Sequence, residues 1–199
     1  LIDRERGGLF DALNWRGGWG NKLSIFMSDH GEMLGDHGIF YKGPYFYEEL
    51  VRVPLIVHWP EQLGGGRRSD ALVELVDLAP TLLEAAGLPT DPSMQGHSLM
   101  ALLAGKRETH RESVYCEYYN THTRYEGVPV YATMCRTREH KIVVCHGREE
   151  GEPYDLRRDP DEFDNLWDRE VGLRHRLMKL AFDRSVFTLD PIPERIAIW

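Results

Sequence analysis

The chain reads Leu23-Ser24-Ile25-Phe26-Met27-Ser28-Asp29-His30-Gly31 at its most informative stretch, an apolar run followed by an acid, a histidine and a glycine. The run of residues 23–27 is short, bounded and β-rich, which predicts a buried strand of an open sheet. Asp29 and His30 then lie at the carboxyl end of that strand. Ligands of open α/β sheets bind outside those strand ends, so we expect this pair to take part in chemistry.

The residue types favour a divalent metal ion. A carboxylate oxygen of Asp29 and an imidazole nitrogen of His30 can turn towards one cation if Gly31 allows a tight bend. Further along the chain, Lys42 is followed by a glycine and a proline. Its ammonium group can neutralise one oxygen of an anionic ester. The structural alternative for the Asp-His dipeptide is an ordinary turn with an Asx-type hydrogen bond.

A longer resemblance extends this pattern. Residues 26–38 read FMSDHGEMLGDHG, residues 42–49 read KGPYFYEE, and residues 51–57 read VRVPLIV. Together they resemble the second metal-binding segment of the sulfatase family, within the alkaline phosphatase superfamily. The resemblance implies that Asp29 and His30 ligate the catalytic cation and that Lys42 contacts the sulfate or phosphate oxygens.

The residue at position 30 bears on the metal and on the branch of the family. Calcium-type arylsulfatases carry Asn there, and His is found in a branch with choline sulfatases and phosphonate monoester or phosphodiester hydrolases. Imidazole favours manganese, zinc or iron over calcium or magnesium, which stay as alternatives. We therefore expect one divalent metal ion and a small anionic ester substrate. Sulfate ester hydrolysis is the leading activity, and phosphonate monoester or phosphodiester hydrolysis is the alternative.

The family's nucleophile is a cysteine in a Cys-x-Pro-Ser-Arg motif, oxidised to formylglycine, upstream of the matched segment. Cys116, Cys135 and Cys145 do not lie in such a motif. The resemblance thus implies the C-terminal part of a sulfatase, with part of an active site. A third reading is a non-catalytic remnant, or a subunit completed by another chain.

Composition excludes some functions. The 199 residues are 42% hydrophobic and carry a formal charge of −8, so a nucleic acid partner is not expected. Apolar stretches are strand-sized, which argues against a membrane span. The three cysteines have no metal-finger spacing, and the first residues lack the apolar core of a signal peptide. These features predict free thiols and a cytoplasmic protein.

Two layers are expected along the chain. Residues 2–13 predict a helix ending near Asn14, residues 51–60 a second strand, and residues 71–73 a short strand or extended link. Residues 77–87 predict a helix with Asp77 as its N-cap, Pro80 in its first turn and Gly87 at its end. The Asp-Leu-Ala-Pro-Thr-Leu-Leu sequence of this helix also resembles the family.

From residue 113 the pattern changes to β-rich runs at 114–118, 131–136 and 140–145, closed by residues 152–156, which predict an antiparallel sheet. An amphipathic helix at 168–183 should cover one face. The fold class is therefore α/β, the C-terminal part of an alkaline-phosphatase-like sandwich plus a small antiparallel sheet. We expect domains at 1–108 and 109–199, and a C-terminal tail that packs on its own domain or forms a homo-oligomer.

The glycine- and aromatic-rich loop of residues 31–50 should line a cleft. Within it, Asp36 and His37 are expected to stabilise the loop, with support of the metal ligands as the alternative. Glu48 and Glu49 are expected to pair with Arg52. His122, Arg124 and Tyr125 are candidates for a substrate-cleft loop, with an ordinary surface loop as the alternative.

Overall fold

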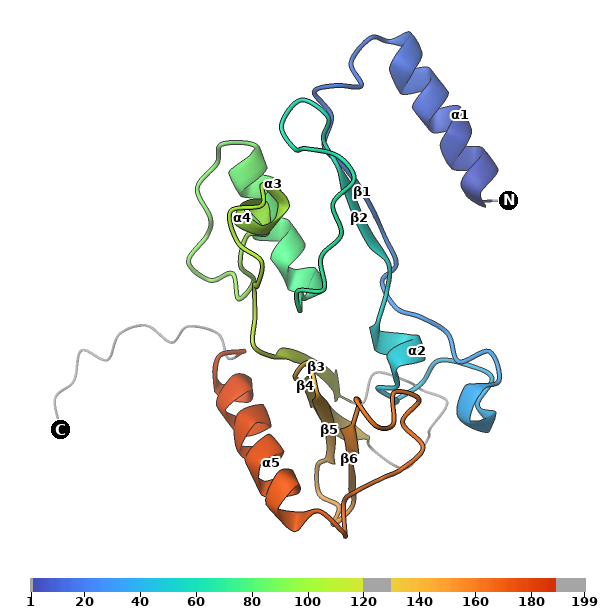
Figure 1. The fold of residues 1–199 in the computed structure, drawn as a ribbon, viewed down its shortest axis with the longest axis vertical. Coiled ribbons are helices and arrows are strands. Elements are labelled where there is room, and N and C mark those ends of the chain that lie inside the picture. Colours follow the sequence, from blue (N-terminus) through green and yellow to red (C-terminus); the bar gives the residue numbers. More distant parts are fainter. Residues whose placement is uncertain (1, 120–129, 189–199) are drawn as a thin grey trace, which may run out of the picture.

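The computed structural model describes residues 2–119 and 130–188 (Figure 1). The helices are α1 (Ile2–Trp15), α2 (Glu48–Val51), α3 (Leu78–Ala85), α4 (Met100–Leu103) and α5 (Val171–Val186). The strands are β1 (Ser24–Met27), β2 (Leu55–His58), β3 (Val114–Tyr119), β4 (Tyr131–Arg136), β5 (His140–Cys145) and β6 (Gly151–Asp155), and two 3-10 turns are η1 (Asp36–Gly38) and η2 (Leu75–Asp77). The C-terminal tail and residues 122–125, on which two expectations depend, lie outside the described residues.

The predicted strand at 23–27 forms as β1, but its surroundings differ from the expectation. It pairs antiparallel with β2, from Ser24 opposite His58 to Met27 opposite Leu55. The expectation of a buried strand is wrong for the described residues, because β2 is the one strand paired with it there and Met27 is 36% exposed. β1 and β2 form the long narrow ribbon between the upper helices and the lower sheet in Figure 1.

The first predicted helix forms as α1 and ends one residue beyond Asn14. Arg6 reaches β1, with its guanidinium carbon 4.2 Å from the centre of the Phe26 ring. The apolar positions Ile2 and Leu9 stay exposed, so this helix does not bury the continuous apolar face that their spacing suggested.

Helix α3 lies within the predicted range and ends as its sequence predicts, although Asp77 does not cap its start. Pro80 lies in the first turn, where a missing backbone donor costs nothing. Gly87 adopts a left-handed backbone with φ 69°, and the amide of Leu88 donates to the carbonyl of Leu83 at 2.9 Å. The preceding residues 71–73 form an extended link, in which Leu72 makes an isolated bridge to Arg111.

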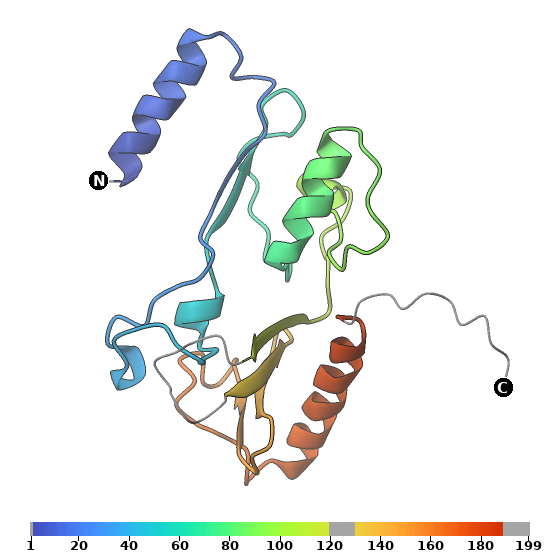
Figure 2. The same cartoon turned by 180° about the vertical axis from the view of Figure 1, so that it is seen from behind.

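The predicted small sheet and its covering helix are confirmed. β3, β4, β5 and β6 pair antiparallel in chain order, and α5 lies along one face (Figures 1 and 2). α5 runs three residues later than the expected 168–183 at both ends. Side chains from the helix and from this face form one core cluster, made of Cys135, Ile142, Leu173, Leu177 and Ala181.

The opposite face of the small sheet carries a second core. Neighbouring strand residues point to opposite faces, so Met134 and Val143 point away from α5. They pack with Ala132 and with Phe46, which comes from the loop before α2. The small sheet therefore lies between α5 and the segment that follows Lys42, and this contact positions the candidate site.

Among the helices in residues 2–119 and 130–188, none combines the length and the apolar character needed to cross a membrane. All three cysteines are free thiols, as expected from their number and spacing.

Candidate metal and anion site

Asp29 and His30 lie directly after β1, as the sequence predicts. The loop is closed by local hydrogen bonds: Ser28 Oγ donates to the His30 carbonyl at 2.6 Å, and the His30 amide donates to Asp29 Oδ1 at 3.1 Å. The second bond joins neighbouring residues, so it is not the Asx-type bond to the second following residue that was given as the structural alternative. This bond leaves the other oxygen of Asp29 available, and this side chain is 83% exposed.

The hydrogen bonds of His30 define its tautomer. His30 Nδ1 lies 2.7 Å from the carbonyl oxygen of Gly31. A carbonyl oxygen only accepts hydrogen bonds, so Nδ1 carries the proton and Nε2 of the neutral ring presents a lone pair. A backbone carbonyl on one ring nitrogen is the usual way in which proteins orient a histidine that binds metal through the other nitrogen.

Gly31 fastens this loop to α2. Its amide donates to the Leu50 carbonyl at 2.8 Å. A Cβ atom at this position would lie 1.7 Å from the Glu49 carbonyl oxygen, so only glycine fits. The sequence predicted glycine for a bend, and the structure shows that close backbone approach is the reason.

Lys42 joins the pair, which completes the predicted group of three. Lys42 Nζ donates to His30 Nε2 over 2.6 Å, and the same Nε2 lies 3.7 Å from Asp29 Oδ2. The pKa of the Asp29 carboxyl is held below its ordinary value, first by its own backbone amide and then by the adjacent His30. Asp29 is thus an anion at neutral pH.

The donor set fits a divalent cation in part. An ionised carboxylate and an imidazole nitrogen with a fixed lone pair are ligands suited to manganese, zinc or iron. Within the described residues, however, no group of three or more His, Cys, Asp or Glu side chains is placed to hold a metal ion. A complete coordination sphere therefore needs donors in addition to Asp29 and His30.

Helix α2 is anchored to the small sheet by ion pairs. The carboxylate of Glu48 accepts from Arg136 Nε at 2.9 Å and pairs with Lys141 Nζ at 2.8 Å. Burial raises the pKa of Glu48, but the charges and hydrogen bonds of Lys141 and Arg136 outweigh burial and hold this pKa below its ordinary value. The expected pairing with Arg52 is wrong for Glu48, because these two cations of the sheet take its place.

Lys141 is the residue of this region that sequence reasoning missed. Its side chain is fully buried, and its ammonium group donates to the Phe46 carbonyl at 2.9 Å and pairs with Glu162 at 2.6 Å. The signal was present: a lysine within the β-rich run of residues 140–145 must find partners if that strand is buried.

His37 stabilises the loop before Lys42, as expected. Its ring stacks on Tyr47 with centroids 3.8 Å apart and on Phe163 with centroids 4.5 Å apart. Asp36 lies beside it in the η1 turn, where its carbonyl accepts from the amide of Ile39.

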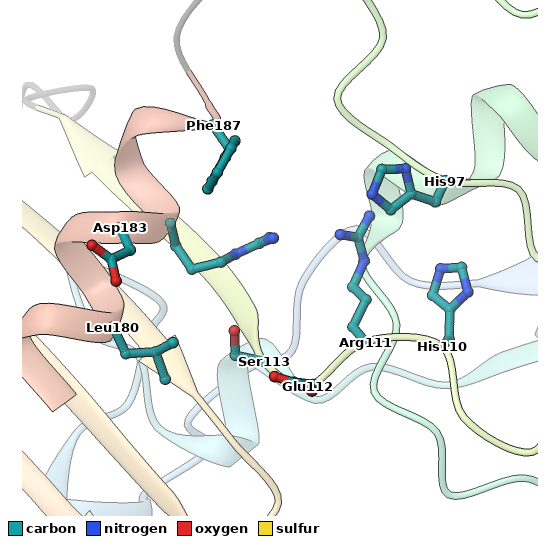
Figure 3. A pocket seen from close by; sticks show the side chains of 9 residues that line it. His97, His110, Arg111, Glu112, Ser113, Leu180, Asp183 and Phe187 are labelled. Atoms are coloured by element: carbon teal, nitrogen blue, oxygen red, sulfur yellow. The ribbon is translucent and has the colours of Figure 1, made fainter. Parts of the chain in front are cut away.

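A cavity of about 310 Å³ lies elsewhere, where α5 ends and β3 begins (Figure 3). It is lined by His97, His110, Arg111, Glu112, Ser113, Leu180, Asp183, Arg184 and Phe187. None of the three predicted site residues lines it. Its arginines are occupied by carboxylates: Arg111 pairs with the buried Asp77, and Arg184 donates to Glu74 at 2.8 Å.

Asp77 departs from its predicted role. Its side chain makes no capping bond to α3 and instead accepts from Arg111 and from the His97 amide at 2.8 Å. Burial raises the pKa of Asp77, but the hydrogen bonds from Arg111 and the His97 amide hold it below its ordinary value. Burial also lowers the pKa of His110, whose Nε2 lies 3.2 Å from Asp77.

Comparison with known proteins gives the family. The family described as N-sulphoglucosamine sulphohydrolase, C-terminal, matches residues 35–180. The match includes Lys42 and the small sheet, and it begins after Asp29 and His30. An N-acetylglucosamine-6-O-sulfatase of Bacteroides thetaiotaomicron is 33% identical over 170 residues, which are 83% of this chain and 30% of that protein. An arylsulfatase of Clostridium perfringens is 34% identical over 172 residues, 85% of this chain and 34% of that protein.

Solved structures agree. A protein in complex with its substrate D-glucosamine-2-N,6-O-disulfate superposes with a TM-score of 0.85 at 29% identity, over 98% of this chain and 40% of that one. The phosphonate monoester hydrolase of Agrobacterium radiobacter also gives a TM-score of 0.85 at 29% identity, over 95% of this chain and 40% of that one.

The fold and these matches define a member of the alkaline phosphatase superfamily. Within that superfamily, the chain belongs to the sulfatase family and corresponds to its C-terminal region. It spans about a third of the length of the curated relatives described above.

Proposed function

We propose that this chain supplies two metal ligands and an anion-binding lysine to the active site of a metal-dependent sulfuric ester hydrolase. One observation carries the proposal. The Gly31 carbonyl fixes the proton of His30 on Nδ1, so Nε2 presents its lone pair where Asp29 Oδ2 and Lys42 Nζ lie 3.7 Å and 2.6 Å away. A turn that served structure alone would not need the lysine there.

Each residue has a distinct role in this proposal. Asp29 and His30 bind the cation, which polarises the ester oxygen and activates the nucleophile when it is bound. Lys42 contacts the oxygens of the transferring group and stabilises the charge that develops on them. His30 Nε2 would be a ligand of the cation, and Lys42, which donates to that nitrogen in this structure, would then direct its ammonium group to the substrate.

The substrate class is a small anionic ester. The relatives named above as sulfatases, one of them acting on a 6-O-sulfated sugar by its name, support a sulfate ester. Phosphonate monoester or phosphodiester hydrolysis is the second candidate, and His30 together with the similarity to the Agrobacterium radiobacter hydrolase favours it.

Parallel rates on an aryl sulfate and an aryl phosphodiester, measured with the complete enzyme, test the proposal. We expect the sulfate ester to be the faster substrate and Asp29→Asn to remove turnover of both. A faster phosphodiester reaction would favour the second candidate. Unchanged turnover in Asp29→Asn would contradict both.

The nucleophile is proposed to be a formylglycine outside residues 1–199, because the cysteines of this chain do not lie in the family's motif. The intact mass and the peptide map of the protein from its own source test this. A species heavier than 23.0 kDa with a formylglycine peptide is expected. A mass of 23.0 kDa would favour a non-catalytic remnant or a subunit that needs another chain.

A further inference from the structure

Two adjacent residues, Glu162 and Phe163, contact the segment that carries Lys42 on both sides of that lysine. They lie in the loop between β6 and α5. On the N-terminal side, the ring of Phe163 stacks on His37 with centroids 4.5 Å apart and an interplanar angle of 23°. The other face of His37 stacks on Tyr47 at 3.8 Å, so the imidazole lies between two aromatic rings.

On the C-terminal side, Glu162 holds the segment. Its Oε2 accepts from the backbone amide of Glu48 at 2.8 Å, and its Oε1 lies 2.6 Å from Lys141 Nζ. The same ammonium group donates to the carbonyl of Phe46 at 2.9 Å. The chain is therefore fixed on either side of Lys42 by residues that lie far away in the sequence.

Backbone conformation also indicates that these contacts hold the two loops in place. His37 and Glu162 both adopt a left-handed backbone, with φ of 52° and 57°. Residues other than glycine hold this conformation at a cost, and they keep it where surrounding contacts determine it. In both cases the contacts are those that join the two loops.

We propose that Glu162 and Phe163 form a clamp that positions Lys42 against the anionic ester. The inference rests on the proposed function and deepens it, because it makes the small sheet a determinant of the rate. A lysine side chain has a long flexible stem, so its contribution to a transition state depends on how well its backbone is fixed. Glu162 and Phe163 are positioning residues in this account, since they act through Lys42.

Phe163→Ala in the complete enzyme is the sharpest test. Phe163 is 73% exposed, so its loss should leave the thermal midpoint and the metal content close to wild type. We expect kcat/KM for the ester to fall about ten- to hundredfold, as misplacement of a reacting group by about 1 Å does. Phe163→Trp keeps a stacking ring and should restore most of the rate.

A double variant distinguishes positioning through Lys42 from a general structural effect. If the clamp acts through Lys42, adding Phe163→Ala to Lys42→Ala should lower the rate no further. Phe182→Ala is the matched control, because Phe182 is 71% exposed and lies on α5, the helix that packs on the opposite face of the small sheet from Phe46. Its rate should stay within about twofold of wild type.

The outcomes distinguish failure of the clamp from failure of the proposed role of Lys42. If Lys42→Ala slows the reaction and Phe163→Ala does not, or if their effects multiply, the clamp is overturned and the proposed function stands. If Lys42→Ala itself leaves the rate unchanged, the proposed role of Lys42 is overturned, and the clamp with it.

Discussion

Replacement of Lys141 by methionine tests the buried ion-pair cluster that joins α2 to the small sheet. Methionine fills a similar volume without the charge. The ammonium group is fully buried and makes contacts of 2.6 to 2.9 Å with Glu162, Glu48 and the Phe46 carbonyl. Glu48 keeps its contact with Arg136 in the variant, so Glu162 is the carboxylate left buried without a cation.

Breaking a buried ion pair from one side costs about 3–5 kcal/mol, because the remaining charge is uncompensated. The measurement is hydrogen exchange by mass spectrometry on peptides from β5, since it reports the opening of this sheet within the full-length protein. The cost corresponds to exchange faster by on the order of a hundred- to several-thousandfold.

Two further variants make this prediction specific. Adding Glu162→Gln to Lys141→Met removes the uncompensated charge, so part of the lost protection should return. Arg157→Met is the matched control, because the exposed pair of Arg157 with Glu139 at 2.7 Å should contribute less than about 1 kcal/mol. A loss below about 1 kcal/mol in Lys141→Met, or no recovery in the double variant, would refute the reasoning.

Three other variants or reactions probe separate features. Asp77→Asn should destabilise the protein by about 3 kcal/mol at pH 7. Because folding lowers the pKa of Asp77 below 3.8, the difference in stability between wild type and variant should shrink as pH falls through the folded-state pKa. A difference in thermal midpoint that does not change with pH would argue against this role of Asp77. Gly31→Ala should cost about 1–3 kcal/mol and reduce bound metal, because its Cβ would overlap the Glu49 carbonyl, whereas Gly64→Ala, which meets nothing within 4 Å, should be neutral by both measurements. Burial raises the pKa of Cys135 to about 11, so iodoacetamide should modify it at pH 8 only after unfolding, and rapid labelling of the folded protein would be inconsistent with its burial.

The sequence predicted most elements because their local signals agree with their surroundings. The proline and glycine that bound α3 act within a few residues, and the uninterrupted β-rich runs of β4 and β5 fit strands that are buried on both faces. The grouping of Asp29, His30 and Lys42 came from resemblance to a family, since spacing alone does not bring Lys42 back to His30.

The failed expectations for Glu48 and Asp77 share a physical cause, which is that ion pairs form between residues far apart in the sequence. Glu48 was assigned to nearby Arg52 and meets Arg136 and Lys141 instead. Asp77 was expected to cap the N-terminus of the helix that follows it, and it pairs with Arg111 instead. A charged side chain in an apolar context signals that it has a partner, but only the fold tells which one.

The metal content of the full-length protein tests the central claim most directly. Elemental analysis of wild type, His30→Ala and Asp29→Asn should show a divalent metal ion in the wild type and its loss in both variants. His175→Ala, an exposed histidine on α5, is the control that should keep the metal. Metal retained at the wild-type level in either ligand variant would contradict the assignment of that residue.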